Sequence, residues 1–467
     1  MKMWSGRFRQ PLDPEFERWQ RSFDFDYRLL PHELAASAVH ARALKGAGVL
    51  SANELSAILE ALDKIGELAV LSPEFLKDSE AEDVHHFVEK QLVALIGDTG
   101  YKLHSGRSRN EQVATDLRLY VRAAIDQQRI GLAEFARVLV ERAEQAGNAA
   151  MPAYTHLQPA EPVLVSHWLL TYVEMFLRDT ERLADCRKRV NVCPLGSGAV
   201  AGATLPLDRR AMAIGLGFDA PTANSIDATS DRDFVLEFVN ILSLLALHLS
   251  RWAEEMILFS SHEFGFIHLP EAYSTGSSAM PQKKNPDLLE LARGKAGRII
   301  GNATALMIAV KGLPLAYNKD LQETQEPLFQ AAEMISSLVP LVTEWMKAAE
   351  FDYQRMQQAA QSGFLNAWAA ATYLVQRGLP FRLAHEQIGK AVQMCLDREC
   401  ELKDLPLHEL RSLNPAFDQD FYSCLTLDAV LAIHDLPGGT AAAQVRQAIA
   451  KAKARIDSIL EESHAHA

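Results

Sequence analysis

The stretch Phe234–Phe259 constrains the fold of this 467-residue chain most strongly, because large apolar residues occupy almost every side of the helix that its spacing predicts. A helix without a polar face has to be surrounded by other helices. Polar residues interrupt its most apolar window, Val235–Leu249, which is too short and too polar to span a bilayer. The stretch therefore predicts the centre of a large helical bundle, shared between the subunits of a homo-oligomer.

Helical spacing of apolar residues dominates the rest of the chain, and no run of alternating β-branched residues, Rossmann glycine pattern or internal repeat is found. The predicted fold is all-α, a long-helix bundle core with smaller helical N- and C-terminal domains. The expected boundaries are 1–111, 112–361 and 362–467. The other predicted long helices are Glu54–Leu71, Val113–Ala146, Leu164–Val190, Leu288–Val310, Leu328–Lys347 and Ala441–Leu460.

The net charge of −13 argues against a nucleic-acid-binding protein and against a protein that binds anionic membrane surfaces. Any anionic ligand then needs a local cluster of positive charge. The five cysteines form no CxxC pair, and their odd number favours reduced thiols in the cytoplasm. The first residues, MKMWSGRFRQ, lack the apolar segment of a signal peptide.

The loop GSSAMPQKKNP, residues 276–286, combines two hydroxyl groups, two lysines and a predicted helix start. Asn285 is expected as the helix N-cap and Pro286 as the first helical residue. The helix dipole and Lys283 then favour an anion at this place, and the small residues suit a lid that closes over a ligand. The alternative interpretation is a solvated surface turn, and Lys284 is expected to be plain surface charge.

The same loop is very similar to the signature loop of the fumarase/aspartase superfamily, GSSxMPxKxNP, and every fixed position of that pattern is present. The variant MPQKKNP is the form found in the branch of argininosuccinate lyases and δ-crystallins. Segments in the order of that family cover nearly the whole chain. They are AEDVHHFVE (81–89), KLHSGRSRNEQVATDL (102–117), YTHLQ (154–158), PLGSGAVAG (194–202), NSIDATSDRDF (224–234), GLPLAYNKDLQE (312–323) and GLPFRLAH (378–385).

This resemblance implies a carbon–nitrogen lyase that converts argininosuccinate to arginine and fumarate by β-elimination through a carbanion, as in arginine biosynthesis. It also implies a homotetramer whose active sites combine segments of different subunits, without a cofactor. Two alternatives are a sister lyase with another N-succinyl or amino-dicarboxylate substrate, and a non-catalytic structural relative. Retention of the catalytic residue types argues against the structural relative.

The resemblance also implies roles for individual residues. Ser277 matches the proposed general base, and Lys283 matches the cation that stabilises the carbanion. His156 and Glu290 match a catalytic histidine and its carboxylate partner, with the direction of proton flow left open. The implied substrate contacts are Ser22, Ser108, Arg109, Asn110, Thr155, Asn285, Tyr317, Gln322 and Gln325.

The chain departs from the family pattern at several positions. Glu111 stands where aspartate is usual, Glu161 where glutamine is usual, and Trp368 where relatives have small or polar residues. Gln325 replaces a lysine that contacts the carboxylate at the arginine end of the substrate. Gln325 can still hydrogen bond to a carboxylate, but it lacks the charge of the lysine, and a hydrogen bond to a charged group is typically worth about 1.5–3 kcal/mol.

No metal site is predicted. His85 and His86 are adjacent and cannot both face one metal from a helix, while His262 and His268 lack a third ligand at suitable spacing. The charges beside His85 are expected to mark a helix start. Arg232 is expected to take part in a structural ion pair.

Overall fold

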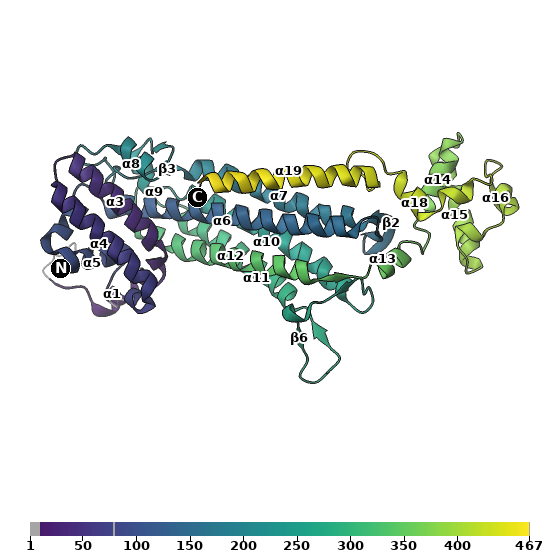
Figure 1. The fold of residues 1–467 in the computed structure, drawn as a ribbon, viewed down its shortest axis with the longest axis horizontal. Coiled ribbons are helices and arrows are strands. Elements are labelled where there is room, and N and C mark those ends of the chain that lie inside the picture. The colour runs from purple at the N-terminus through teal and green to yellow at the C-terminus, as the bar shows by residue number, and fades with distance from the viewer. Residues whose placement is uncertain (1–9, 78–79, 467) are drawn as a thin grey trace. The chain divides into compact units, whose positions relative to one another are not determined.

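The computed structural model describes residues 10–77 and 80–466 (Figure 1). The first nine residues and the last one, which fall in the expected terminal domains, lie outside the described residues. The chain forms two compact units. Unit 1 comprises residues 1–128, 182–243 and 297–335, and unit 2 comprises residues 129–181, 244–296 and 336–467.

The all-α prediction is confirmed, and each predicted long helix is present with small differences at its ends. Several of these helices contribute residues to both units. Their bounds are α4 (Ala52–Leu71), α6 (Arg109–Ala146), α7 (Val165–Val190), α10 (Asp233–Ser260), α11 (Asp287–Val310), α12 (Gln325–Ala348) and α19 (Ala442–His466).

Local sequence sets the start of α4. The side chain of Ser51 accepts a hydrogen bond from the backbone N–H of Glu54, and the Glu54 carboxylate accepts one from the N–H of Ser51. This capping box satisfies two donors that the first helical turn leaves without partners. Ile58, Leu62 and Ile65 then line the buried side of the helix.

Unit 1 places α3 against α4 and α8, and α4 against α5 (Figure 1). A small core of buried apolar side chains, Ala36, Met212 and Phe218 among them, joins α3 to α8. The remaining elements of the unit are α1 (Pro14–Trp19), α2 (Phe23–Asp26), η1 (Tyr27–Leu29), α3 (Leu30–Gly46), η2 (Pro73–Leu76), α5 (Val84–Ile96), η3 (Gly97–His104), β3 (Val192–Cys193), α8 (Arg209–Gly215), β4 (Ala220–Pro221), α9 (Ser225–Ser230) and η5 (Lys319–Thr324).

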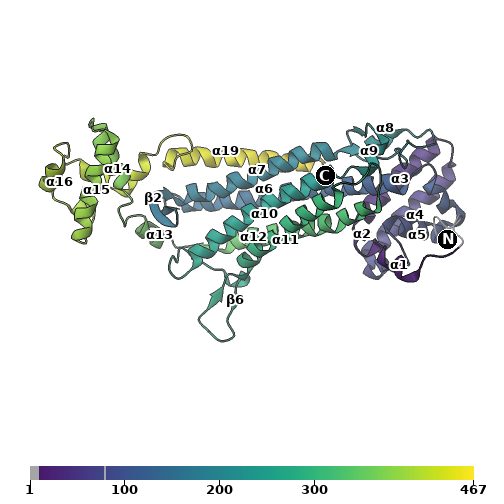
Figure 2. The same ribbon diagram turned by 180° about the vertical axis from the view of Figure 1, so that it is seen from behind.

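Unit 2 has an aromatic core between the long helices. The ring of Phe135 of α6 packs against Phe176 of α7 and Trp252 of α10. The ring centroids of Trp252 and Trp345 of α12 lie 5.3 Å apart, and the two rings are nearly perpendicular. A second core of buried apolar side chains holds the helices of residues 364–425 together, and α14 and α15 among them lie against each other (Figure 2). The remaining elements are β1 (Ala150–Thr155), β2 (Gln158–Leu164), β5 (Ile267–His268), η4 (Glu271–Tyr273), β6 (Thr275–Gly276), β7 (Lys284–Asn285), β8 (Glu350–Phe351), α13 (Tyr353–Ala359), α14 (Ala367–Gln376), α15 (Phe381–Asp397), η6 (Leu402–Asp404), α16 (Leu407–Leu413), α17 (Phe421–Cys424) and α18 (Leu427–Ala432).

The antiparallel hairpin of β1 and β2 was not expected, because the sequence MPAYTHLQPAEP predicts only a break between helices. Its prolines hide the strand pattern, since proline cannot donate a ladder hydrogen bond. Pro152 lies opposite Pro162 in the register, which places two residues without an N–H in the same pair.

Among the described helices, α10 alone is long and apolar enough to cross a membrane by length and composition. Half of its most apolar window is buried by the rest of the chain, as in a core helix. Leu244 and Leu247 of this helix remain 40% and 45% exposed. A single chain therefore surrounds α10 only in part.

Candidate active site

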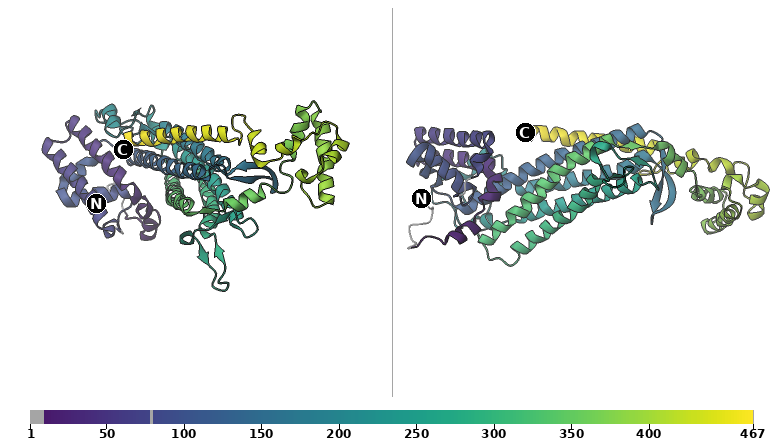
Figure 3. Two further views of the ribbon diagram at one scale, coloured as in Figure 1. Left: turned by 45° about the vertical axis from the view of Figure 1, so that its right-hand side comes forward. Right: turned by 90° about the horizontal axis from the view of Figure 1, so that it is seen from below.

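The signature loop joins the two short strands of a hairpin. Thr275 and Gly276 of β6 pair with Asn285 and Lys284 of β7, and the loop between them stands away from the helices of unit 2 (Figure 3). The hydroxyl oxygen of Ser277 accepts hydrogen bonds from the backbone N–H groups of Ala279 at 3.3 Å and Met280 at 3.1 Å. Two donors aimed at this oxygen would stabilise negative charge on it.

The predicted N-cap role of Asn285 is wrong. Asn285 lies in β7, and α11 begins at Asp287. The first hydrogen bond of the helix runs from the N–H of Glu290 to the carbonyl of Pro286. Because Asn285 is paired in the hairpin, the helix begins further along the chain than predicted. Lys283 is exposed at the end of the loop. Lys284 is surface charge as predicted, because its ammonium group donates to the carbonyl of Leu269 and lies 3.5 Å from Glu271.

His156 lies at the tip of the hairpin of β1 and β2, directly after Thr155. His156 and Leu157 both have positive φ angles, 55° and 58°, between the paired residues Thr155 and Gln158. This is the two-residue turn that normally selects asparagine and glycine. Leucine is strained there, so the turn fixes the backbone at His156 at a cost in stability, while the His156 side chain itself is exposed.

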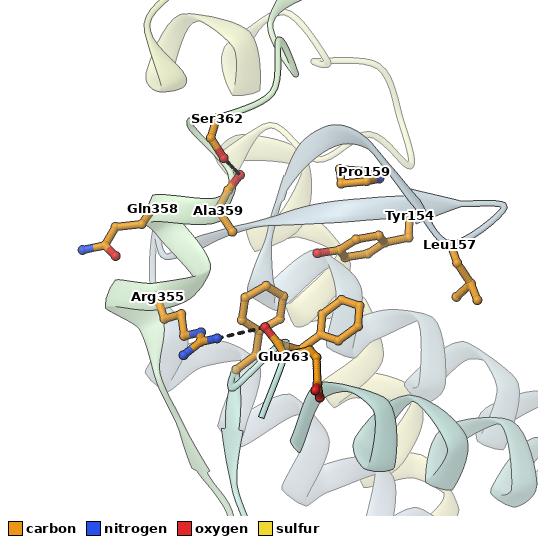
Figure 4. Close-up of a pocket in the computed structure, with 10 residues that line it drawn as sticks. Tyr154, Leu157, Pro159, Glu263, Arg355, Gln358, Ala359 and Ser362 are labelled. Atoms are coloured by element: carbon orange, nitrogen blue, oxygen red, sulfur yellow. Dashed lines mark hydrogen bonds between the residues drawn. The ribbon is translucent and has the colours of Figure 1, made fainter. Parts of the chain in front are cut away.

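A cavity of about 570 Å³ lies beneath this turn (Figure 4). Tyr154, Leu157 and Pro159 line one side, and the phenyl rings of Phe264 and Phe266 form part of the other. The guanidinium of Arg355 donates to the carbonyl of Glu263 at its edge, as Figure 4 shows. None of the predicted site residues lines the cavity.

Glu290 is exposed on α11. No hydrogen bond or ion pair joins it to His156 within the described part of one chain. The pairing that the resemblance implies is therefore not made inside a single subunit by direct contact.

A second group of predicted residues belongs to unit 1 and begins at the start of α6. The hydroxyl of Ser108 accepts the N–H of Asn110, and the carboxylate of Glu111 accepts the N–H of Ser108 at 2.9 Å. The other oxygen of Glu111 accepts the N–H of Gly198 at 2.9 Å. Burial raises the pKa of this carboxyl group, which these backbone hydrogen bonds oppose. The longer side chain of Glu111 thus joins two loops.

Arg109 extends from this turn toward α5. Its Nη1 lies 2.5 Å from Oδ1 of Asp83, and the same oxygen accepts the N–H of His86 at 2.7 Å. Asp83 is the N-cap of α5, as the charges beside His85 predicted. One carboxylate therefore caps a helix and positions a guanidinium.

The segment that carries Ser22 lies nearby in unit 1. Ser22 is buried, and its hydroxyl donates to Oδ2 of Asp26 at 2.6 Å. The amide of Gln322 donates to the carbonyl of Gln20 at 3.1 Å, which ties this segment to η5. Gln325 is only 4% exposed, and its Oε1 has no hydrogen-bond partner among the described residues.

Tyr317 follows a strained residue, since Ala316 has a φ angle of 66°. Burial raises the pKa of Tyr317, which the charge of Arg232 opposes. The predicted ion pair of Arg232 is wrong, because the carboxylate of Asp231 pairs with Arg118. Arg232 is buried, donates to the backbone carbonyl of Asp231, and keeps Nε and Nη2 without partners among the described residues. This buried cation beside Tyr317 is a candidate site residue that the sequence did not reveal.

The described residues contain one group with the geometry of metal ligands. Atoms of Glu33, His85 and Asp116 lie within 4.8 Å of one another and are buried. His85 already hydrogen bonds to Asp116, and Arg107 lies 3.5 Å from Glu33. These neighbours favour a network of ion pairs over a cation site.

Comparison with known proteins finds relatives that match the chain over its whole length. A family described as lyase matches residues 6–301, and a family described as argininosuccinate lyase C-terminal matches residues 364–432. The argininosuccinate lyase of Acidobacterium capsulatum is 58% identical over the full length of both chains. That of Koribacter versatilis is 57% identical, also over the full length of both.

Solved structures share the fold. The crystal structure of an EDDS lyase in complex with formate matches with a TM-score of 0.84 at 25% identity, covering 97% of this chain and 92% of that one. The recombinant class II fumarase of Schistosoma mansoni matches with a TM-score of 0.73 at 17% identity, covering 85% and 90%. The likeness to the fumarase concerns the fold alone.

Proposed function

The chain belongs to the argininosuccinate lyase family, and from this premise we propose that it cleaves argininosuccinate to arginine and fumarate. It is a carbon–nitrogen lyase with a small-molecule, anionic substrate. The observation that carries the proposal is full-length identity of 58% to a relative with that name. The residues that would perform the chemistry are all retained.

In the first step, Ser277 takes a proton from Cβ of the succinyl group, and the electron pair moves into the adjacent carboxylate. A serine can act as a base only where its alkoxide is stabilised. The N–H groups of Ala279 and Met280 at its oxygen support this role. Lys283, six residues further on, supplies positive charge for the dianion that forms.

In the second step, the bond between Cα and the guanidinium nitrogen breaks, and that nitrogen leaves with a proton. His156, on the strained tip of its hairpin, is the candidate acid or relay, with Glu290 as the carboxylate that raises its basicity. Thr155 and Asn285 hold the succinyl carboxylates. General acid–base groups of this kind each contribute about 10²–10⁴-fold to the rate.

The group in unit 1 holds the rest of the substrate. Arg109 binds a carboxylate with its planar guanidinium, and Ser108 and Asn110 complete this turn. Ser22, Tyr317, Gln322 and Gln325 contact the arginine end. No cofactor is assigned a role in these steps.

We propose a homotetramer in which different subunits supply three sets of residues to one site: the Ser277 loop with Glu290, the hairpin turn with His156, and the group in unit 1. Leu244 and Leu247 of α10, with Leu291, Met307 and Ile308 of α11, are exposed apolar residues that a neighbouring subunit would cover. The exposed positions of His156 and Glu290 support a pairing between subunits.

A mixing experiment tests the shared site. His156→Asn and Ser277→Ala are each expected to fold and to lose turnover by orders of magnitude. Co-refolding them in equal amounts should restore roughly a quarter of wild-type activity if the two residues of a site come from different subunits that assemble at random. No recovery from well-formed mixed tetramers would place both residues in one subunit.

All five cysteines are free thiols, which supports a cytoplasmic enzyme. The function itself is tested by fumarate release, followed by ultraviolet absorbance, from purified protein and argininosuccinate. Release of fumarate and arginine in equal amounts is expected. A folded oligomer that releases neither, but acts on another N-succinyl substrate, would overturn the assignment in favour of a sister lyase.

A further inference from the structure

His85 lies within a group of buried charged side chains in unit 1. Its side chain is 1% exposed. Nε2 lies 2.9 Å from Oδ2 of Asp116 and 3.7 Å from Oε2 of Glu33, while Nδ1 lies 3.7 Å from Oδ2 of Asp83. Carboxylates thus face both ring nitrogens, and none of the proposed catalytic steps uses this histidine.

At Nε2 the contact with Asp116 is a hydrogen bond, whereas at Nδ1 the 3.7 Å separation from Asp83 is an ion-pair distance without a hydrogen bond. A neutral imidazole has one N–H donor and one lone pair, so one of its nitrogens would present a lone pair to a carboxylate. Only the imidazolium ion offers a proton at each nitrogen. Burial by itself lowers the pKa of His85, but Glu33, Asp116 and Asp83 together raise it to about 10.

Two arginines also lie against carboxylates of this group. Arg107 lies 3.5 Å from Glu33, and Arg109 lies 2.5 Å from Asp83. Burial, and after it the charge of Glu33, raises the pKa of Asp116 to about 8, so this carboxyl group holds a proton at neutral pH while Glu33 and Asp83 face the two guanidinium groups. Buried charges are stable only when they are paired in this way.

Asp83 connects this network to the proposed site. Its Oδ1 holds Arg109 and caps α5, while its Oδ2 faces His85. We propose, on the basis of the function proposed above, that His85 is a positioning residue: held by Glu33 and Asp116, its imidazolium orients the Asp83 carboxylate so that Arg109 presents its guanidinium to a substrate carboxylate. His85 itself does not touch the substrate.

A double-mutant cycle on the full-length protein tests the coupling. His85→Gln keeps a donor near Asp116 but removes the nitrogen that faces Asp83, and Asp83→Asn removes the charge through which His85 acts. Each single variant is expected to raise KM for argininosuccinate about tenfold with a much smaller change in kcat. The double variant should have the KM of Asp83→Asn alone.

The matched control is His86→Gln, the next residue on the same helix, whose ring nitrogen accepts the N–H of Glu82. Its KM should equal that of the wild type. Free energies of unfolding are measured for every variant, so that a loss of fold is recognised. If His85→Gln does not fold, Asp116→Asn replaces it in the cycle, with the same increase in KM expected.

Multiplicative KM effects in folded variants, or an unchanged KM for His85→Gln, would overturn the proposal. Loss of thermal stability on EDTA treatment, restored by Zn²⁺, would also overturn it, because a cation would then occupy the place of the ring protons. If the wild type does not turn over argininosuccinate, the proposed function fails by itself. The Kd for succinate is then measured for the same four proteins of the cycle. The same non-additivity of the two substitutions is expected, and additive effects on this Kd would contradict the coupling.

Discussion

The carboxylate of Glu111 accepts the backbone N–H of Gly198, 87 residues further along the chain, at 2.9 Å. Its other oxygen accepts the N–H of Ser108 at the same distance. One buried side chain thus anchors the loop of Gly198 to the turn that carries Arg109, and the glutamate that departs from the family pattern has a defined structural role.

Replacing Glu111 with alanine is expected to lower the free energy of unfolding by about 2–4 kcal/mol, because two N–H groups lose their acceptor. KM should rise as the turn of Ser108 loosens. Thermal unfolding and steady-state kinetics measure the two effects. Glu111→Gln, which keeps one acceptor, should recover part of both. Glu54→Ala, at the capping box of α4, is the control and should affect stability alone.

Leu157→Gly is expected to raise stability slightly while it lowers kcat. Relief of the positive φ angle is worth about 1–2 kcal/mol, and the added flexibility of glycine offsets about 0.5–1 kcal/mol of it. The looser turn would no longer hold His156 in place. The control is Glu399→Gly, which removes a similar strain at a φ angle of 51° and should leave kcat unchanged. Equal kcat values for both variants would contradict a functional use of the strain.

Gln325→Leu is expected to keep or raise the free energy of unfolding, by up to about 1 kcal/mol, because it removes a buried acceptor without a partner. KM for argininosuccinate should rise several-fold if the amide contacts the arginine end. Gln128→Leu is the matched control, since Gln128 is also buried with its Oε1 unpaired. An unchanged KM in Gln325→Leu would remove Gln325 from the site.

The protein is expected to lose stability as the pH falls below about 6.5. Burial, with a smaller contribution from Arg107, lowers the pKa of His40 to about 3, and its Nε2 lies 3.0 Å from the carbonyl of Ser105. The unfolded chain therefore takes up a proton near pH 6.5 that the folded chain refuses until about pH 3. This difference costs about 2 kcal/mol at pH 5.

Denaturant titrations of wild type and His40→Gln between pH 7 and pH 5 measure this effect. The glutamine amide can keep the donor to the Ser105 carbonyl but has no proton to gain. The variant should therefore lose less stability on acidification. The slope of its free energy of unfolding against pH should be smaller than that of the wild type by the equivalent of about one bound proton per chain. Parallel curves would show that another group carries the acid sensitivity.

The sequence predicted the helical part of the fold well, because each helix depends on neighbours three and four residues away. The ends of α4 and α7 follow from local apolar spacing, and Ser51 marks the start of α4 by its own side chain. The hairpin that carries His156 was missed, because its strands are stabilised by pairing across the turn and contain prolines that argue against strands.

The composition of the candidate site followed from motifs, which list residue types in order along the chain. The contacts among those residues did not. Arg232 lies next to Asp231 in the sequence, yet the Asp231 carboxylate pairs with Arg118 and leaves Nε and Nη2 of the buried Arg232 without partners among the described residues. Ion pairing depends on which charged groups lie close together in space, and the separation of two residues along the chain does not define this distance.

The sequence by itself determined the all-α class, the long helices and the family, and it proposed the catalytic residues of the Ser277 loop, since these depend on local periodicity and short motifs. Only the tertiary structure decided that Glu33, His85 and Asp116 lie close together next to Asp83, and that Asp83 forms an ion pair with Arg109. Burial removes water from these groups, so their protonation and orientation depend on neighbours from distant parts of the chain.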